Sequence, residues 1–320
     1  MAKDLSRREF IGVLGGAGVA AGLGSATSSA KSLTVPANQL GFAAPPPASR
    51  KKPHVVFVTG DDEYRSEVSM PMIAEILDAR HGFKCTVVYA VDPRTGKRNP
   101  KHQQNIEGLE AVKTADLAVI FLRFRALPDN QLKLILDYVN SGRPIVGLRT
   151  STHAFRYPKG HKNVGYNAGF GREVFGQKWI AHEGSRYGTR VLAAVKDHPI
   201  MRGVASDFWV RSWLYNVIPL HGDCVTLALG YATDVDRGPV DPKDKHPRRN
   251  VVGTPNPVAW TKTYKGAPVF FTTLGHPKDF EVESMRRLLI NGIYWVLGKE
   301  VPEGGANAEI QGEYTGPPTH

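Results

Sequence analysis

Short apolar runs alternate with helical patterns through the middle of this 320-residue chain, and this alternation restricts the fold more than any other feature. Alternating strands and helices are typical of βαβ units, which build a parallel sheet. In the helical pattern at 129–142, apolar residues recur at i, i+3, i+4 and i+7 before a glycine stop. We therefore predict an α/β fold, a three-layer flavodoxin-like parallel sheet with helices on both faces. The predicted strands are 54–59, 84–91, 117–122, 144–148, 178–182, 190–195, 224–229, 258–263 and 268–274, and the predicted helices are 66–80, 129–142 and 279–297.

The N-terminus has the order of features that is typical of a twin-arginine signal peptide. Arg7 and Arg8 precede an apolar stretch at 11–24, and small residues at 24–26 and 28–30 offer cleavage sites. The apolar stretch is too short and too weakly hydrophobic to span a bilayer, which takes about 20 residues. We therefore expect no membrane span, and we expect residues 1–30 to direct export to the periplasm or the extracellular medium.

Composition divides the rest of the chain. Residues 31–51 are rich in proline and predict an extended linker, so the folded domain is expected to cover 52–299. Residues 300–320 carry many glycines and prolines and almost no large apolar residues, which predicts a flexible C-terminal tail. Cys85 and Cys224 form no CxxC pair, and a disulfide between them stays open.

The chain is basic, because 41 Lys and Arg residues against 30 Asp and Glu residues give a formal net charge of +11. Such a charge is typical of proteins that bind polyanions, nucleic acid among them. However, the positive residues are spread out, and the densest runs, 50–52 and 243–249, lie in proline-rich loops without interleaved aromatic residues. We therefore interpret the charge as solvated loop surface and expect no nucleic-acid partner.

Polar residues follow several predicted strands, at the place where open parallel sheets bind their ligands. Asp61 follows the first strand, Arg123 the third, Arg149 and Thr150 the fourth, and His276 the last. We expect these side chains to meet in one crevice. No GxGxxG or Walker loop follows the first strand, which argues against a dinucleotide or nucleoside triphosphate. Asp61 takes part in acid/base or cation chemistry, or else it only stabilises a turn.

Arg149 occupies the middle of a strand-to-helix turn, where related folds expose a Ser or Cys nucleophile. Arginine cannot attack, and neither cysteine is nearby in the sequence, so a Cys/His amidotransferase mechanism is disfavoured. Arg149 can instead bind an anionic or carbonyl oxygen, with Thr150 as a hydroxyl donor, or it can pair structurally with an acid.

Four histidines, His153, His182, His221 and His276, follow or end apolar runs, where a side chain can point into a crevice. There they can serve as base, acid or metal ligand. Their spacings match no compact motif such as HExxH, so a divalent metal stays an open alternative and no cofactor is assigned. We expect His276, His182 and Asp61 to carry the catalysis.

Several segments of the chain resemble a known family. They are PVAW at 257–260, VFFTTLGH at 269–276, RRLLINGI at 286–293 and DHPI at 197–200. In these segments the chain is similar to the ThuA-like, or trehalose-utilisation, proteins, which share a class I glutamine amidotransferase-like fold. The resemblance covers most of 52–298. Two positions differ from the family, which often has His where Arg149 stands and an acidic residue before the Leu-Tyr pair that here follows Trp213.

The resemblance implies a role in carbohydrate metabolism, on trehalose-like disaccharides or their 3-keto derivatives. In this hypothesis His276 or His182 moves a proton next to a carbonyl, while Arg149 or a metal stabilises the oxyanion. We expect a small carbohydrate ligand to contact a set of polar and aromatic side chains: Arg149, Thr150, His153, Arg123, Tyr215 and Trp260.

Two other functions stay open. The absence of an obvious nucleophile favours a non-catalytic carbohydrate-binding or interaction module on the same fold. The His and Asp residues at the strand ends favour an enzyme, which is the interpretation we prefer. A polyanion-binding protein ranks last, and the oligomeric state is left open.

Overall fold

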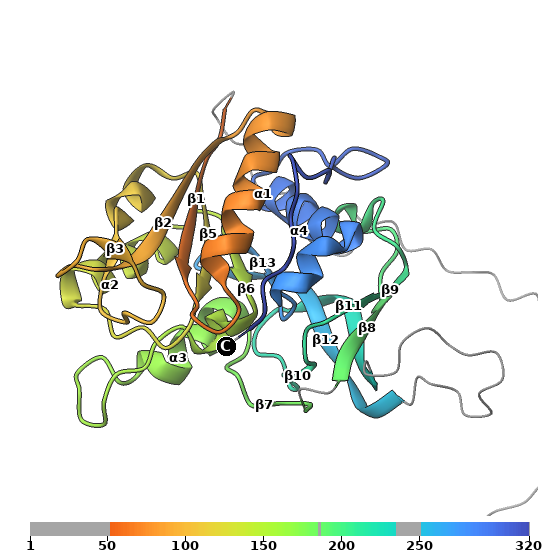
Figure 1. Ribbon diagram of the computed structural model, residues 1–320. Coiled ribbons are helices and arrows are strands. Elements are labelled where there is room, and N and C mark those ends of the chain that lie inside the picture. Colours follow the sequence, from red (N-terminus) through yellow and green to blue (C-terminus); the bar gives the residue numbers. More distant parts are fainter. Residues whose placement is uncertain (1–51, 185–186, 235–250, 320) are drawn as a thin grey trace, which may run out of the picture.

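The computed structural model describes residues 52–184, 187–234 and 251–319 (Figure 1). The predicted signal peptide and linker lie outside the described residues, as does the basic run at 243–249. Within the described part, we find no helix with the length and apolar character that crossing a membrane requires.

Five strands form the parallel half of the main sheet, in the spatial order β2-β1-β5-β6-β13. Every residue of β1, β5 and β6 is buried, which explains why these strands are continuous apolar runs in the sequence. The predicted parallel sheet is confirmed for this half. The bounds are β1 (His54–Gly60), β2 (Lys84–Asp92), β5 (Leu117–Leu122), β6 (Ile145–Leu148) and β13 (Ala267–Thr272).

Helices cover both faces of this sheet and complete three layers, as predicted (Figure 1). On one face lie α1 (Ser66–His81) and α4 (Glu283–Val296), and on the other lie α2 (Asp129–Val139) and α3 (Tyr166–Phe175). The amphipathic stripe predicted for α2 is buried against the sheet.

The other half of the sheet is antiparallel, which the prediction of a parallel sheet did not include. Beyond β13 the order continues with β12 (Val251–Tyr264), β11 (Val225–Asp234), β8 (Tyr187–Ala193) and β9 (Asp207–Val210). Only Lys265 and Gly266, both with positive φ, connect β12 to β13, and such a two-residue hairpin turn joins antiparallel strands.

Shorter elements complete the fold. A separate antiparallel pair joins β7 (Ala181–His182) to β10 (Tyr215–Asn216), so the strand predicted at 178–182 is shorter than expected. The helix predicted at 279–297 is divided into a 3-10 turn and α4. The remaining elements are β3 (Lys97–Arg98), β4 (Ile106–Glu107) and the 3-10 helices η2 (Leu109–Thr114), η3 (Arg149–His153), η4 (Pro199–Met201) and η5 (Pro277–Glu281).

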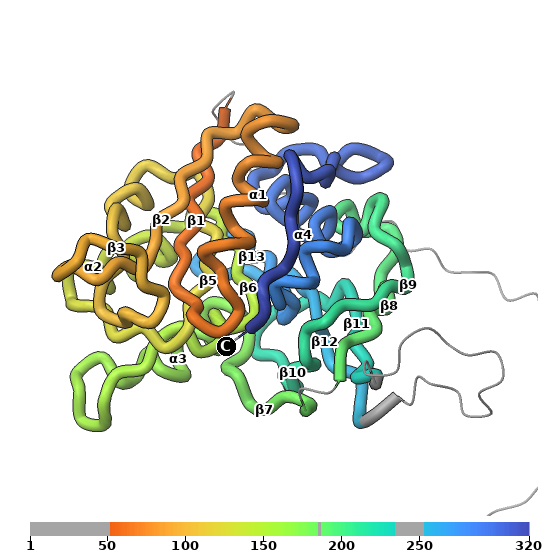
Figure 2. The backbone as a smooth tube through the Cα atoms, viewed as in Figure 1, coloured from red at the N-terminus to blue at the C-terminus, as the bar shows by residue number. Residues whose placement is uncertain are grey.

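The C-terminal segment, predicted to be a flexible tail, packs against the domain and runs beside α4 (Figure 2). Ala306 and Ala308 are buried, so small side chains fill contacts that the composition did not reveal. Asn291 of α4 holds the segment: its side-chain oxygen accepts from the backbone N–H of Ala306 at 2.9 Å. Its amide donates to the carbonyls of Ile200 at 2.9 Å and Arg202 at 2.8 Å.

Cys85 and Cys224 are free thiols. Cys85 packs with the core under α1 and α4, whereas Cys224 packs with the core under α2 and α3. The sheet lies between these two cores, so the disulfide left open by the sequence is not formed.

We expect Asn291→Ala to lower the free energy of unfolding by about 3 kcal/mol, because it removes two buried hydrogen bonds and one partly buried one and leaves their backbone partners unpaired. Urea denaturation measures the change. Asn307→Ala, an exposed position in the same C-terminal segment, is the matched control and should change the stability by less than about 0.5 kcal/mol. Equal losses in the two variants would contradict this account of the packing.

Candidate functional site

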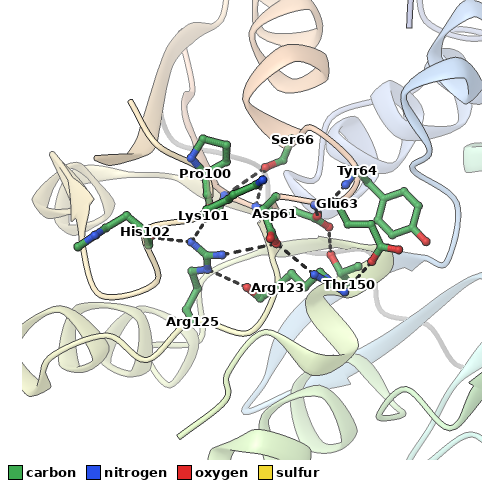
Figure 3. Close-up of polar contacts among 12 residues, drawn as sticks. Asp61, Glu63, Tyr64, Ser66, Pro100, Lys101, His102, Arg123, Arg125 and Thr150 are labelled. Carbon is green, nitrogen blue, oxygen red and sulfur yellow. Dashed lines mark hydrogen bonds and ion pairs between the residues drawn. The ribbon is translucent and has the colours of Figure 1, made fainter. Parts of the chain in front are cut away.

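Asp61 lies at the centre of a hydrogen-bonded turn that follows β1 (Figure 3). Its Oδ1 accepts from the backbone N–H groups of Glu63 and Tyr64, both at 2.8 Å. Its Oδ2 accepts a short hydrogen bond from the hydroxyl of Thr150 in η3. The loop after β1 is thereby joined to the loop after β6, as the strand-end argument predicted.

The carboxyl group of Asp61 is completely buried. Burial raises its pKa to about 6, although the hydrogen bonds from Thr150 and Tyr64 act in the opposite direction. Its protonation therefore changes close to neutral pH. Because the residue has no solvent-exposed surface, Asp61 makes no direct contact with a ligand in this conformation, and its hydrogen bonds reach only Thr150, Glu63 and Tyr64.

Two arginines balance the acidic residues of the same turn. Arg123 binds Asp62 at 3.2 Å and Glu63 at 2.8 Å. Arg125 is completely buried, donates to backbone carbonyls at 2.7 to 3.0 Å and lies 3.8 Å from Asp62. Arg123, expected to contact substrate, is thus engaged in holding the turn. Arg125 was not singled out from the sequence, although it follows β5 by the same logic.

Arg149 lies between two tyrosine rings, which the sequence did not indicate. Its guanidinium carbon is 4.0 Å from the ring centre of Tyr64 and 4.5 Å from that of Tyr215. The side chain is completely buried, and its Nη1 donates to the carbonyls of Trp213 at 3.2 Å and Thr273 at 2.9 Å. Among the described residues, no carboxylate forms an ion pair with it, so structural pairing with an acid does not explain this arginine. We call Tyr64, Arg149 and Tyr215 the arginine stack.

His276 carries a neutral ring at the start of η5. Its Nδ1 accepts from the backbone N–H of Lys278 at 3.1 Å, so Nε2 carries the proton. Burial lowers the pKa of His276 to about 3, and the charge of Arg149 adds to this effect. The ring centre lies 6.1 Å from that of Tyr64. His276 can therefore donate a hydrogen bond to a ligand oxygen without carrying a charge.

Asp279 fixes the backbone of this loop, and the sequence interpretation missed it. Its Oδ2 accepts from the N–H groups of Gly275 at 2.9 Å and His276 at 3.1 Å, and its Oδ1 accepts from that of Ser212 at 2.9 Å. The hydroxyl of Ser212 also donates to it. The signal that could have revealed Asp279 is its spacing of three residues from His276, which is that of a capping box.

His153 and His182 lie near Tyr215, with ring centres at 6.3 and 6.4 Å from it. Burial lowers the pKa of His153 to about 3, so this ring is neutral. His182 is exposed on β7, and its Nδ1 is 2.7 Å from the carbonyl oxygen of Glu183. Nδ1 therefore donates, and Nε2 is left as an acceptor. The centre of the His182 ring lies 5.1 Å from that of Trp213.

Two residues that were singled out from the sequence, Trp260 and His221, are not part of the arginine stack. Trp260, expected to contact a sugar, is completely buried, and its Nε1 donates to the carbonyl of Phe175 at 2.8 Å. Its ring has no exposed face for a sugar, because β12 directs it into the core beneath α3. His221 pairs with Glu173 at 3.2 Å.

Within the described ranges, no group of three or more His, Cys, Asp or Glu side chains is arranged to hold a metal ion. The three histidines near the strand ends instead lie against aromatic rings: His153 and His182 near Tyr215, and His276 near Tyr64. These side chains offer proton transfer and hydrogen bonding to a ligand.

A family model described as "ThuA: Trehalose utilisation" matches residues 54–296. No curated protein matches the chain. The structure is similar to a putative ThuA-like protein from Bacteroides uniformis ATCC 8492, at 15% identity and a TM-score of 0.52, over 80% of this chain and 96% of that chain. A putative ThuA-like protein from Parabacteroides merdae ATCC 43184 gives 17% identity and a TM-score of 0.50, over 81% and 98% of the two chains.

The structural neighbours also include a carbohydrate-active enzyme. Agd3, described as a novel carbohydrate deacetylase, is 13% identical with a TM-score of 0.45, over 77% of this chain and 32% of that chain. The two ThuA-like structures show the fold, a mixed α/β architecture of the class I glutamine amidotransferase-like type.

Removing the charge of Asp61 is expected to stabilise the protein. Its pKa is about 6 in the folded state, against an ordinary value of 3.8. Between pH 4 and 6 the folded state therefore binds more protons than the unfolded state, and stability falls as the pH rises. Asp61→Asn keeps an oxygen and gains an N–H for Thr150. We expect it to remove this fall and to raise the free energy of unfolding at pH 8 by up to about 3 kcal/mol.

Urea denaturation at pH 4, 6 and 8 tests this expectation. Asp137→Asn, an exposed position on α2, is the control and should leave the pH dependence as it is in the wild type. An Asp61→Asn protein that is less stable than the wild type at pH 8 would show that the buried carboxylate does not destabilise the fold.

Proposed function

The chain belongs to the ThuA family, linked to trehalose utilisation, and from this we propose that it is an enzyme that processes a disaccharide or keto sugar by acid/base chemistry. One observation carries the proposal: His182 and His276 both lie beside the arginine stack, one with a hydrogen-bond acceptor and the other with a hydrogen-bond donor. His182 offers a free ring nitrogen, and His276 offers a neutral N–H donor. Acid/base chemistry needs this pairing of an acceptor with a donor.

His182 is the proposed base. It is exposed on β7, and its Nε2 has no hydrogen-bond partner in the described part of the chain. When it removes a proton from the carbon next to a carbonyl, the electron pair moves to the carbonyl oxygen and an enediolate forms. His276 and Arg149 supply the donors that stabilise this charge.

Asp61 is a positioning residue in this proposal. It holds Thr150 through the hydroxyl and Tyr64 through the backbone, and Tyr64 packs against Arg149. Its protonation near neutral pH therefore changes the hydrogen bonding around the stack without contact with the sugar.

An aromatic rim supports a carbohydrate as the ligand. Trp179 is 38% exposed, and its ring centre lies 5.7 Å from that of His153 and 5.9 Å from that of His182. The ring centre of Trp213 also lies near that of His182, at 5.1 Å. Flat aromatic faces that border a polar site are suited to the C–H faces of sugars.

A non-catalytic carbohydrate-binding module is the second candidate. The complete burial of Asp61 and Arg149 favours it, because in this conformation only the exposed rim contacts solvent. This candidate requires sugar binding without turnover, whereas the enzyme requires product.

We also propose that the protein is exported, on the basis of the arginine pair and the apolar stretch at 11–24. Replacing both Arg7 and Arg8 by Lys should keep the full-length protein in the cytoplasm, because the export machinery selects the arginine pair. Cell fractionation and immunoblotting measure the distribution. Equal export of the wild type and the double variant would contradict the twin-arginine route.

We expect His182→Gln and His276→Gln each to lower turnover by at least about 100-fold. The first variant loses the proposed base, and the second loses the proposed hydrogen-bond donor. Proton NMR of the purified protein with trehalose, other disaccharides and their 3-keto forms measures product. His221→Gln, which removes the ring that pairs with Glu173 outside the arginine stack, is the matched control and should retain turnover.

The same NMR experiment separates the candidates. Broadened sugar signals without product would select the binding module, and unchanged signals for every sugar would contradict both proposals. Repeating the incubation with a chelator tests the metal alternative, because loss of turnover that added metal restores would reveal a divalent ion.

A further inference from the structure

Three hydrogen-bond donor atoms beside Tyr64 are shielded from solvent and have no partner among the described residues. They are Nε and Nη2 of Arg149 and Nε1 of Trp213. Both residues pack against Tyr64: the guanidinium carbon lies 4.0 Å from its ring centre, and the indole ring centre lies 6.1 Å from it. The unpartnered donors therefore belong to one cluster.

Such donors are unfavourable unless something binds them. A buried polar group without a partner destabilises the fold, and a buried charged group without one does so more strongly. Arg149 also has a φ of +39°, a backbone conformation that non-glycine residues rarely adopt. Strain and unpaired donors at the same residue are typical of a position that is kept for a ligand.

The neighbouring acids have other partners, and none of those that the structure describes forms an ion pair with Arg149. Asp279 accepts from Ser212 and from the loop backbone, and Asp62 and Glu63 bind Arg123. The Tyr64 hydroxyl interacts with the Arg149 guanidinium, but burial raises the pKa of the Tyr64 and Tyr215 hydroxyls, so neither becomes a phenolate that would balance the charge of Arg149.

The ligand group that fits this cluster accepts hydrogen bonds and donates none. Arginine presents its N–H groups as a planar fork, which matches two oxygens held in one plane. A sugar hydroxyl is a poor match, since it is a single oxygen and brings its own proton. A carboxylate or an enediolate has two coplanar oxygens and a negative charge for the buried guanidinium.

We propose that the donor cluster of Arg149 and Trp213 binds a planar oxyanion of the substrate, either the carboxylate of a sugar acid or the enediolate of a keto sugar. This inference rests on the proposed function and adds the substrate class. Trp213 is half-buried and contacts the exposed ring of His182, so the cluster is adjacent to the rim where a sugar enters.

Calorimetric titration of the purified protein with a matched pair of sugars tests the proposal. The pair is methyl α-glucoside, which is neutral, and methyl α-glucuronide, which carries a carboxylate at the same ring. Gluconohydroxamate is the third probe, since its planar oxygens imitate an enediolate. We expect at least one of two probes, the glucuronide or the hydroxamate bound in its deprotonated form, to bind about 10-fold or more tightly than the neutral glucoside.

Variants locate the binding in the cluster. Arg149→Gln should abolish the preference for the anion, and Trp213→Phe, which keeps a ring but loses Nε1, should reduce it by about 3-fold to 10-fold. Arg172→Gln removes an exposed arginine on α3 and is the matched control that should retain the full preference. Because Trp213→Phe preserves the ring packing, the test stands even where Arg149→Gln does not fold.

The outcomes separate this inference from the proposed function. Preference for the glucuronide identifies a carboxylate in the substrate, and preference for the hydroxamate alone identifies an enediolate formed during the reaction. A neutral glucoside that binds as tightly as both the glucuronide and the hydroxamate would overturn the inference without contradicting the proposed function. An anion preference that survives in both Arg149→Gln and Trp213→Phe would also overturn it. Absence of binding for all three probes, together with absence of turnover, would overturn both.

Discussion

The carboxyl ends of five parallel strands meet at one edge of the sheet, and this constraint decides where the candidate functional side chains lie. A strand that helices cover on both faces has no exposed surface, so polar functional side chains can lie only beyond its end. The loops after β1, β5, β6 and β13 meet there. Asp61, Arg123, Arg149 and His276, one from each loop, are brought together although more than 200 residues separate the first from the last.

Burial then determines the charge that each of these groups carries. Removal from water raises the pKa of Asp61 and lowers that of His276, so both groups move toward their neutral forms. Arginine cannot lose its proton in the same way, and Arg149 remains charged between two aromatic rings. Arg149 therefore keeps a positive charge at the centre of the site, where a neutral residue would be easier to bury.

Much of this arrangement could be predicted from the sequence, because it depends on patterns of apolar residues. The buried strands β1, β5 and β6 are short apolar runs, and the edge at which they end follows from their parallel order. Asp61 and Thr150 were expected in one crevice, and the structure joins them by a hydrogen bond.

The rest depends on contacts between distant residues, which the sequence does not display. An aromatic residue in an apolar run has the same local pattern in a core and at a site, so the burial of Trp260 was not apparent. The packing of the C-terminal segment depends on Asn291 and on small alanines, and composition alone indicated flexibility. Of the two tyrosines around Arg149, Tyr64 comes from the loop after β1 and Tyr215 from β10, so no local pattern indicates the stack.

Deuterium exchange tests the central claim most directly, because the account requires removal of a proton next to a carbonyl. The purified protein is incubated with 3-keto-trehalose in deuterated water, and proton NMR follows the hydrogen on the carbon next to the ketone. The account predicts that this signal disappears faster with the wild type than in buffer, and that His182→Gln abolishes the acceleration. Exchange at the buffer rate in the presence of wild-type protein that binds this sugar would contradict the account.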